Sequence, residues 1–178
     1  GKKFAGTFDG QEYTISNLKI TRGLSNTAAN NSIGLFGACT NTAKLQNFTL
    51  NNVDVSGSLN VGAVLGGSGG AEAKITNVHV TGSVKVYGYW YVGGIMGKGY
   101  TNVTDSSVEG DGVNSSYVSI TGGYVGGIVG FMGEGNNVTT GCRVENLTVS
   151  GAYNGIGGIN GILHYGNTIS DCTVNNVV

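Results

Sequence analysis

One six-residue block decides the fold of this chain: Val92-Gly93-Gly94-Ile95-Met96-Gly97. The block returns with small changes at 61–66 and 125–130, and two more distant relatives lie at 34–37 and 156–161. The glycines that close the five copies are 29, 31, 33 and 31 residues apart. A period near 30 residues is the signature of a repeat architecture, in which each repeat buries its apolar face against its neighbours.

A second block lies between the copies of the first and keeps nearly the same period. It occupies 15–20, 45–50, 75–80, 103–108, a looser stretch at 138–144, and 169–174. Its fourth and sixth positions are mostly apolar and its fifth is polar, which predicts a strand with one buried face. Its third position holds residues that accept turn conformations: Asn17, Asn47, Asn77, Asp105, Gly141 and Asp171. We therefore expect a corner there, with the Asn side chains of successive turns forming a hydrogen-bonded ladder.

The two in-phase blocks predict an all-β fold, a right-handed parallel β-helix (solenoid) of about six turns. No run with the 3.6-residue period of a helix is present, which disfavours helix-bearing repeats. The Gly-Gly pair at 93–94 indicates a bulge, a bend or a close backbone approach, and it leaves the facing of this block open. Residues 173–178 still follow the repeat, and a solenoid needs polar caps. We therefore expect residues 1–178 to be one solenoid domain within a longer protein.

The composition excludes several classes of protein. Gly is high at 34 residues, Pro is absent, and 39% of residues are hydrophobic, so neither collagen nor a disordered linker fits. Nine basic and ten acidic residues give a net charge of −1, without the basic patch that nucleic-acid binding requires. No stretch of about 18 apolar residues predicts a membrane-spanning helix in this segment.

The blocks at 92–97 and 125–130 resemble the GLUG motif of bacterial surface proteins, and residues 4–20 look like the opening turn of the same arrays. This resemblance covers essentially the whole chain. It implies a right-handed β-helix on an exported protein, either an adhesin-like surface protein or the non-catalytic region of a zinc-dependent IgA-cleaving peptidase. Those peptidases cut with a His-Glu-x-x-His helix. Here the only histidines are His79 and His164, and neither lies in that pattern.

The charged residues do not form a convincing catalytic set. Glycan-cleaving β-helices need clustered carboxylates or a calcium site beside a basic residue, and the densest acidic group here is Asp105, Glu109 and Asp111. We interpret that group as a solvated loop, with a metal or catalytic site as the alternative. His79 is expected on the outer face between Thr49 and Ser107, without a carboxylate to orient it as a base. We predict no catalytic residue, no metal and no cofactor.

Two of the three cysteines are expected in neighbouring turns. Cys142 and Cys172 share an inward column with Leu18, Phe48, Val78 and Ser106. A stack of small buried thiols is the simpler interpretation. A disulfide is the alternative, because a spacing of about 4.8 Å between turns lies within the permitted Cα range.

An aromatic cluster is the candidate binding surface. It comprises Tyr87, Tyr89, Trp90 and Tyr91, and Tyr124 holds the position of Tyr91 in the next repeat, so the two rings are expected to stack. Aromatic faces bind sugar rings and make protein hot spots. The alternative is that the rings cover the core or form a structural ladder.

These observations favour a non-enzymatic repeat segment of a bacterial surface or secreted adhesin, acting as a stalk or binding platform for a glycan or a host protein. We expect it to be extracellular or at the cell surface. The alternative function is the non-catalytic scaffold region of a secreted enzyme, either an IgA-type metallopeptidase or a carbohydrate-active β-helix. A cleft combining carboxylates with Lys or Arg would favour the enzyme, and an exposed aromatic strip on a charge-poor surface would favour binding.

Overall fold

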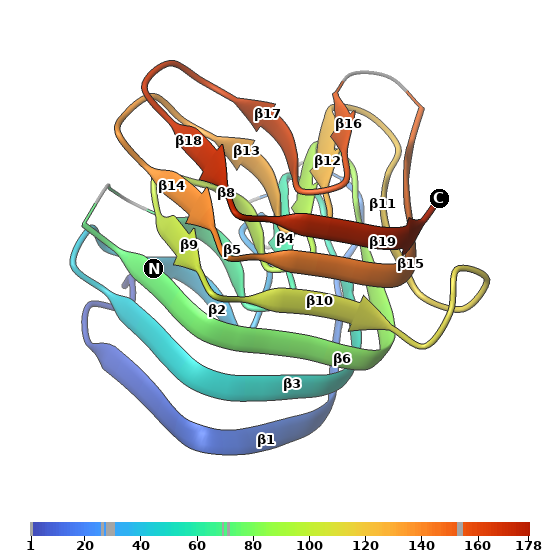
Figure 1. Ribbon diagram of the computed structural model, residues 1–178, viewed down its shortest axis with the longest axis horizontal. Coiled ribbons are helices and arrows are strands. Elements are labelled where there is room, and N and C mark those ends of the chain that lie inside the picture. The colour runs from blue at the N-terminus through green and yellow to red at the C-terminus, as the bar shows by residue number, and fades with distance from the viewer. Residues whose placement is uncertain (1, 26, 28–30, 69, 71, 153–154) are drawn as a thin grey trace.

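The strands stack in parallel, one turn above the next, as a β-solenoid of about five turns (Figure 1). The computed structural model describes residues 2–25, 27, 31–68, 70, 72–152 and 155–178, and within these ranges it contains no helix. The predicted fold class is confirmed. The five copies of the glycine block account for about five turns. The sixth copy of the second block, at 169–174, adds one more layer of strand at the red end of Figure 1.

Three parallel sheets form the faces of the solenoid. The ten-stranded sheet contains β1 (Thr7–Thr21), β3 (Lys44–Ser56), β6 (Lys74–Gly88), β9 (Asn102–Thr104), β10 (Ser107–Gly110), β11 (Tyr117–Ile120), β14 (Val138–Thr140), β15 (Arg143–Gly151), β18 (Thr168–Ser170) and β19 (Thr173–Val177). The four-stranded sheet contains β4 (Asn60–Gly62), β7 (Tyr91–Gly93), β12 (Tyr124–Gly126) and β16 (Ile156–Gly157). The five-stranded sheet contains β2 (Phe36–Cys39), β5 (Leu65–Ser68), β8 (Met96–Gly99), β13 (Val129–Met132) and β17 (Asn160–Leu163).

The apolar positions of successive turns stack directly on one another in the core. Leu50 lies beside Val80, Val80 beside Val108, and Val108 beside Val144, and all four side chains are fully buried. Burying a side chain of this size stabilises the fold by about 1.5–3 kcal/mol relative to leaving it exposed. A column of such residues in every turn therefore explains why the repeat keeps Val, Leu and Ile at these positions.

The predicted corner exists, and its backbone has the unusual conformation that the sequence indicated. Positive φ angles occur down one column, at Asn47, Asn77, Asp105, Gly141 and Asp171. Asn and Asp tolerate this left-handed region better than other residues with a Cβ. The amide of Asn77 donates to Asn47 Oδ1 at 3.1 Å, which confirms the ladder for this pair of turns.

A second corner follows five residues after the first, and sequence analysis did not find it. Its positive φ angles are at Asn17, Asn52, Gly82, Asn146 and Asn176. It too forms side-chain bonds between turns, because Asn176 Nδ2 donates to Asn146 Oδ1 at 2.9 Å. The long strands of the ten-stranded sheet therefore bend twice, and the recurrence of Asn or Gly five residues after each first-corner residue was the available signal.

The first turn has a different register from the one that we predicted. Ile15 lies beside Leu50, Leu18 beside Val53, and Lys19 beside Asp54, so residues 15–20 do not lie over 45–50. Asn17 consequently belongs to the second corner, and Leu18 is outside the column of Cys142. The prediction was wrong because both halves of a long strand alternate apolar and polar residues, so the pattern fits either register. A bulge between Asp9 and Tyr13 sets the register instead.

In the glycine block, backbone packs closely against backbone, and the structure shows which side chains of the block point into the core. Val92, Ile95 and Met96 all point into the core and are fully buried. A Cβ on Gly93 would overlap the carbonyl oxygen of Met96 and would lie 2.7 Å from the amide nitrogen of Gly130. The bend between the four-stranded and five-stranded sheets therefore forms a crease in which backbone packs against backbone, with no room for a side chain.

Candidate functional site

Four of the five predicted aromatic residues gather in one row at the glycine crease. Tyr91 of β7 lies beside Tyr124 of β12, and their rings stack with centroids 6.0 Å apart and an angle of 8° between planes. The expected stacking of these two tyrosines is thus confirmed. The centroid of Trp90 lies 6.2 Å from that of Tyr91 and 5.8 Å from that of Tyr89.

Phe131 extends this row, and sequence analysis missed it. Its ring meets Tyr91 edge-on, with centroids 4.9 Å apart, and lies 6.3 Å from Tyr124. Phe131 comes from β13 in the five-stranded sheet, whereas the two tyrosines belong to the four-stranded sheet. Only the fold of the crease brings the two sheets together. We call Tyr89, Trp90, Tyr91, Tyr124 and Phe131 the aromatic strip.

A lysine and a histidine border the aromatic strip. Lys98 Nζ lies 4.7 Å from the ring centroid of Tyr91 and 4.9 Å from that of Phe131, which is the geometry of a cation–π contact. The ring of His164 lies 4.9 Å from that of Phe131. These contacts place one positive charge against an otherwise aromatic surface.

The strip is partly open to solvent. Tyr89 is 42% exposed, and the other four rings are half-buried. Half-buried rings keep one edge or face available while the remainder packs on the scaffold, so little conformational entropy is lost when a partner binds. Chemically, the strip can stack on the C–H face of a sugar ring or receive apolar side chains of a protein.

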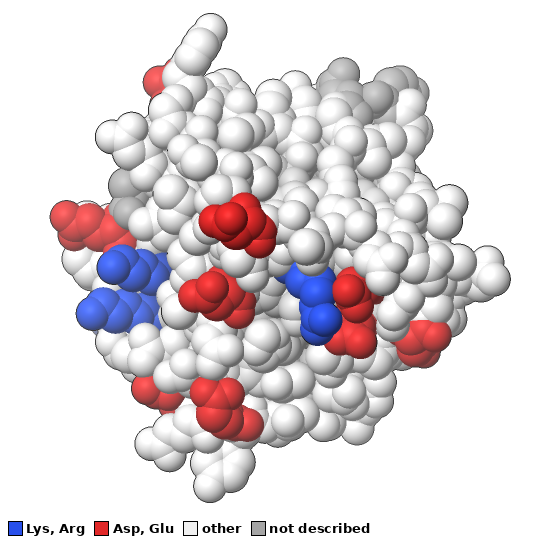
Figure 2. All heavy atoms as spheres, viewed as in Figure 1, with Lys and Arg blue, Asp and Glu red and all other residues white. Residues whose placement is uncertain are grey.

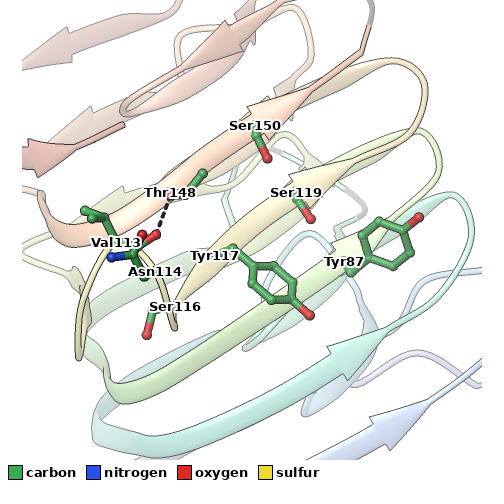
Figure 3. Close-up of a pocket in the computed structure, with 8 residues that line it drawn as sticks. All are labelled: Tyr87, Val113, Asn114, Ser116, Tyr117, Ser119, Thr148 and Ser150. Carbon is green, nitrogen blue, oxygen red and sulfur yellow. Dashed lines mark hydrogen bonds between the residues drawn. The ribbon is translucent and has the colours of Figure 1, made fainter.

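Tyr87 is the predicted site residue that lies on a different surface. It projects from β6 onto the outer face of the ten-stranded sheet, where its neighbour in β11 is Ser119. There it lines a groove with Tyr117 (Figure 3). The structure therefore divides the predicted cluster between two surfaces.

The acidic residues singled out in the sequence are engaged separately. Asp105 occupies a corner position and is exposed. Glu109 Oε2 lies 3.4 Å from Arg143 Nη2. The hydroxyls of Ser115 and Ser116 donate to Asp111, and these hydrogen bonds hold the pKa of its carboxyl below the ordinary value. Within the described ranges, no three His, Cys, Asp or Glu side chains are grouped to hold a metal ion. Figure 2 shows charged side chains as small isolated groups on one face.

His79 has the neighbours that the repeat predicted. It lies between Thr49 and Ser107 on adjacent strands. Its Nδ1 is 2.8 Å from Ser107 Oγ, and its Nε2 is 3.0 Å from Asn77 Oδ1. Both ring nitrogens are thus engaged by side chains of the scaffold, which gives His79 a role in the corner ladder.

Cys142 and Cys172 occupy neighbouring turns as free thiols. Burial raises the pKa of the Cys142 thiol to about 12. Its Sγ donates to the carbonyl oxygen of Thr140 at 3.4 Å, and Cys172 Sγ donates to that of Ser170 at 3.2 Å. A thiol with so high a pKa is a poor nucleophile at neutral pH, so we interpret Cys142 as a core-packing residue.

No helix among the described residues is long and apolar enough to cross a membrane.

Comparison with known proteins relates the chain to parts of longer proteins. It is 30% identical over 186 residues to an immunoglobulin A1 protease of Streptococcus sanguinis, which covers 99% of this chain and 9% of that protein. It is 37% identical over 97 residues to halomucin of Haloquadratum walsbyi, which covers 54% of this chain and 1% of that protein. No protein-family model matches, so the resemblance to the GLUG motif remains a prediction.

A solved structure has the same fold. The crystal structure of a protein from Bacteroides ovatus, described as a candidate immunoglobulin A1 protease, superposes with a TM-score of 0.57 at 21% identity. The match covers 96% of this chain and 61% of that one. The likeness in structure shows the β-solenoid fold, and the likeness in sequence relates this chain to a small portion of two far longer proteins.

Proposed function

We propose that this chain is a non-catalytic repeat segment of a bacterial surface or secreted protein, and that it acts as a stalk and binding platform. The observation that carries the proposal is the aromatic strip. Five rings lie in a continuous row on the outside of a rigid, charge-poor solenoid. The ligand class that fits this row is a glycan or an apolar segment of a host protein.

Rigidity supports the role of the strip as a contact surface. Tyr91 and Tyr124 are held by neighbouring strands, and Phe131 is held by a strand of the adjoining sheet. Sites built on strands are more precise than sites on loops. The low share of charged residues, 11%, leaves stacking and van der Waals contact as the main sources of affinity.

A second candidate function is favoured by the comparisons. The relative that spans nearly the whole chain is named an immunoglobulin A1 protease. On this proposal the chain is a scaffold region that positions a substrate for a catalytic domain elsewhere in a longer protein. Its natural ligand would then be the immunoglobulin A1 that gives the relative its name.

One binding experiment separates these functions. The purified chain is applied to a glycan array and, separately, to immobilised human immunoglobulin A1 with immunoglobulin G as the reference. Glycan binding supports the platform, and selective binding of immunoglobulin A1 supports the scaffold. Binding to neither contradicts both proposals.

Variants then test the strip itself. Trp90→Ala and Tyr124→Ala are each expected to weaken binding by at least about tenfold, the loss typical of a hot-spot aromatic residue. The matched control is Tyr13→Ala, which removes a 73% exposed tyrosine from β1. Equal binding by all three variants would show that the ligand contacts another surface.

A further inference from the structure

A second surface, separate in chemistry from the aromatic strip, lies on the outer face of the ten-stranded sheet. Tyr117 of β11 has Thr148 of β15 beside it, and Ser119 has Ser150. On the other side of β11, Ser119 lies beside Tyr87 of β6. These side chains line a groove of about 440 Å³, within the range of about 300–1,000 Å³ that is usual for small-molecule sites.

An extra loop forms one wall of this groove. Seven positions separate Gly110 from Tyr117, whereas three separate their partners Gly82 and Lys85 in β6. The added residues interrupt the long strand and rise above the sheet at Val113 and Asn114, as Figure 3 shows. The longer connection between β10 and β11 therefore forms a wall beside the strands that line the groove.

Hydrogen bonds hold the loop in place. Asp111 Oδ1 accepts from the hydroxyls of Ser115 at 2.6 Å and Ser116 at 2.5 Å. Thr148 Oγ1 donates to the carbonyl oxygen of Val113 at 2.7 Å, which ties the loop to the sheet (Figure 3). The wall is therefore formed before any ligand arrives, and preorganisation of this kind reduces the entropy lost on binding.

The groove offers polar groups that the scaffold does not use. In the part of the chain that the structure describes, the hydroxyls of Tyr87, Tyr117, Ser119 and Ser150 have no hydrogen-bond partner. Each hydroxyl can donate one bond and accept two. Two half-buried tyrosine rings stand among them as apolar surfaces.

None of the residues that line the groove is charged. Lys85, beside Tyr117 in β6, lines a neighbouring hollow together with Asp54 instead. An anionic ligand such as a phosphate or a sulfated sugar would need Arg or Lys in the lining. A purely apolar ligand would leave the four hydroxyls unsatisfied, which is unfavourable. A molecule with many neutral hydroxyls and one apolar C–H face satisfies both requirements, and that description fits a neutral saccharide.

We infer that the groove between Tyr87 and Tyr117 binds one or two residues of an uncharged saccharide. The tyrosine rings pack against C–H faces of the sugar, while the Ser119 and Ser150 hydroxyls and the Asn114 amide bond to its hydroxyls. This site is independent of the aromatic strip, so it stands whether or not the strip binds a ligand.

The test is an NMR titration of the ¹⁵N-labelled chain with four neutral disaccharides: lactose, maltose, cellobiose and N,N′-diacetylchitobiose. At least one of them, at up to about 10 mM, is expected to shift the amide resonances of Tyr117–Ile120 and Ser150, since millimolar affinity is ordinary for a small open site. The anionic 3′-sialyllactose is the charged reference. The inference fails if no neutral disaccharide shifts these resonances or if only the charged sugar does.

Two variants tie the shifts to the groove. Tyr117→Ala removes a ring, and Ser150→Val fills the groove at an exposed strand position where a β-branched residue is well tolerated. Each is expected to reduce affinity by about tenfold or more. Tyr13→Ala, which removes an exposed tyrosine from β1 outside both surfaces, is expected to leave the titration unchanged. Loss with Trp90→Ala but not with Ser150→Val would place the sugar on the strip and overturn the inference.

Discussion

The solenoid bends in two ways that are stabilised by opposite means. At the crease, Gly93 is required because a side chain would collide with backbone of its own turn and of the next. At the first corner, Asn77 is favoured because its backbone has a φ of 53° and its side chain bonds to the turn below. One bend needs the absence of a side chain and the other uses its presence. Recurrence in a repeat therefore does not by itself reveal what a residue contributes.

Gly93→Ala is expected to have the largest effect on folding. Its new Cβ would meet backbone atoms of Met96, Ile128 and Gly130, which cannot move as a flexible side chain could. Every copy of the block has glycine here, whereas the next position holds Ala63 in one turn and Gly94 in another. Overpacking of this kind costs about 3 kcal/mol or more in free energy of unfolding. Urea denaturation measures the loss.

Gly67→Ala is the matched control for that variant. Gly67 lies in the neighbouring sheet, and the nearest atom to its added Cβ would be Ser32 Oγ at 3.2 Å, the end of a side chain that can move. We expect a change below about 1 kcal/mol. Equal losses at Gly67 and Gly93 would mean that the cost of the added side chain does not come from close backbone packing at the crease.

Asn77→Ala and Asn77→Gly separate the two contributions at the corner. Alanine both loses the side-chain bonds to Asn47 and Glu12 and places a Cβ in the left-handed region, at a combined cost of about 2–3 kcal/mol. Glycine loses the bonds but accepts the backbone, so its cost is expected to be about 1 kcal/mol. Denaturation of both variants gives the comparison. If the glycine variant is no more stable than the alanine variant, the whole loss at this corner comes from the missing side-chain bonds and none from the backbone conformation.

Much of this architecture could be predicted from sequence because identical chemistry recurs at a fixed period. The first corner followed from Asn and Asp at one position of the second block, and the stacking of Tyr91 on Tyr124 followed from their common place in the glycine block. The register of β1 could not be predicted, since alternation is the same in both halves of a long strand. The bulge between Asp9 and Tyr13 fixes it instead, and Phe8, before the bulge, packs edge-on against Phe48 with ring centroids 5.2 Å apart.

The candidate sites were less predictable than the fold because they depend on contacts between faces. Phe131 joins the aromatic strip only because the crease folds the five-stranded sheet against the four-stranded one. The groove at Tyr117 depends on a loop whose length matters only when it is compared with the neighbouring turns. Both features depart from the repeat, so the repeat pattern alone could not predict which residues they bring together.

Lys98→Met is expected to have the smallest effect, and it tests whether the crease has a role beyond folding. The ammonium group lies over the rings of Tyr91 and Phe131, a contact worth about 0.5–1 kcal/mol at a partly exposed site. Met keeps the length of the stem and removes the charge, whereas Lys98→Arg keeps the charge and is expected to be neutral. Thermal unfolding compares the three proteins. If Met matches Lys in stability, the cation does not hold the rings in place, and Lys98 is then free to contact a ligand on the strip.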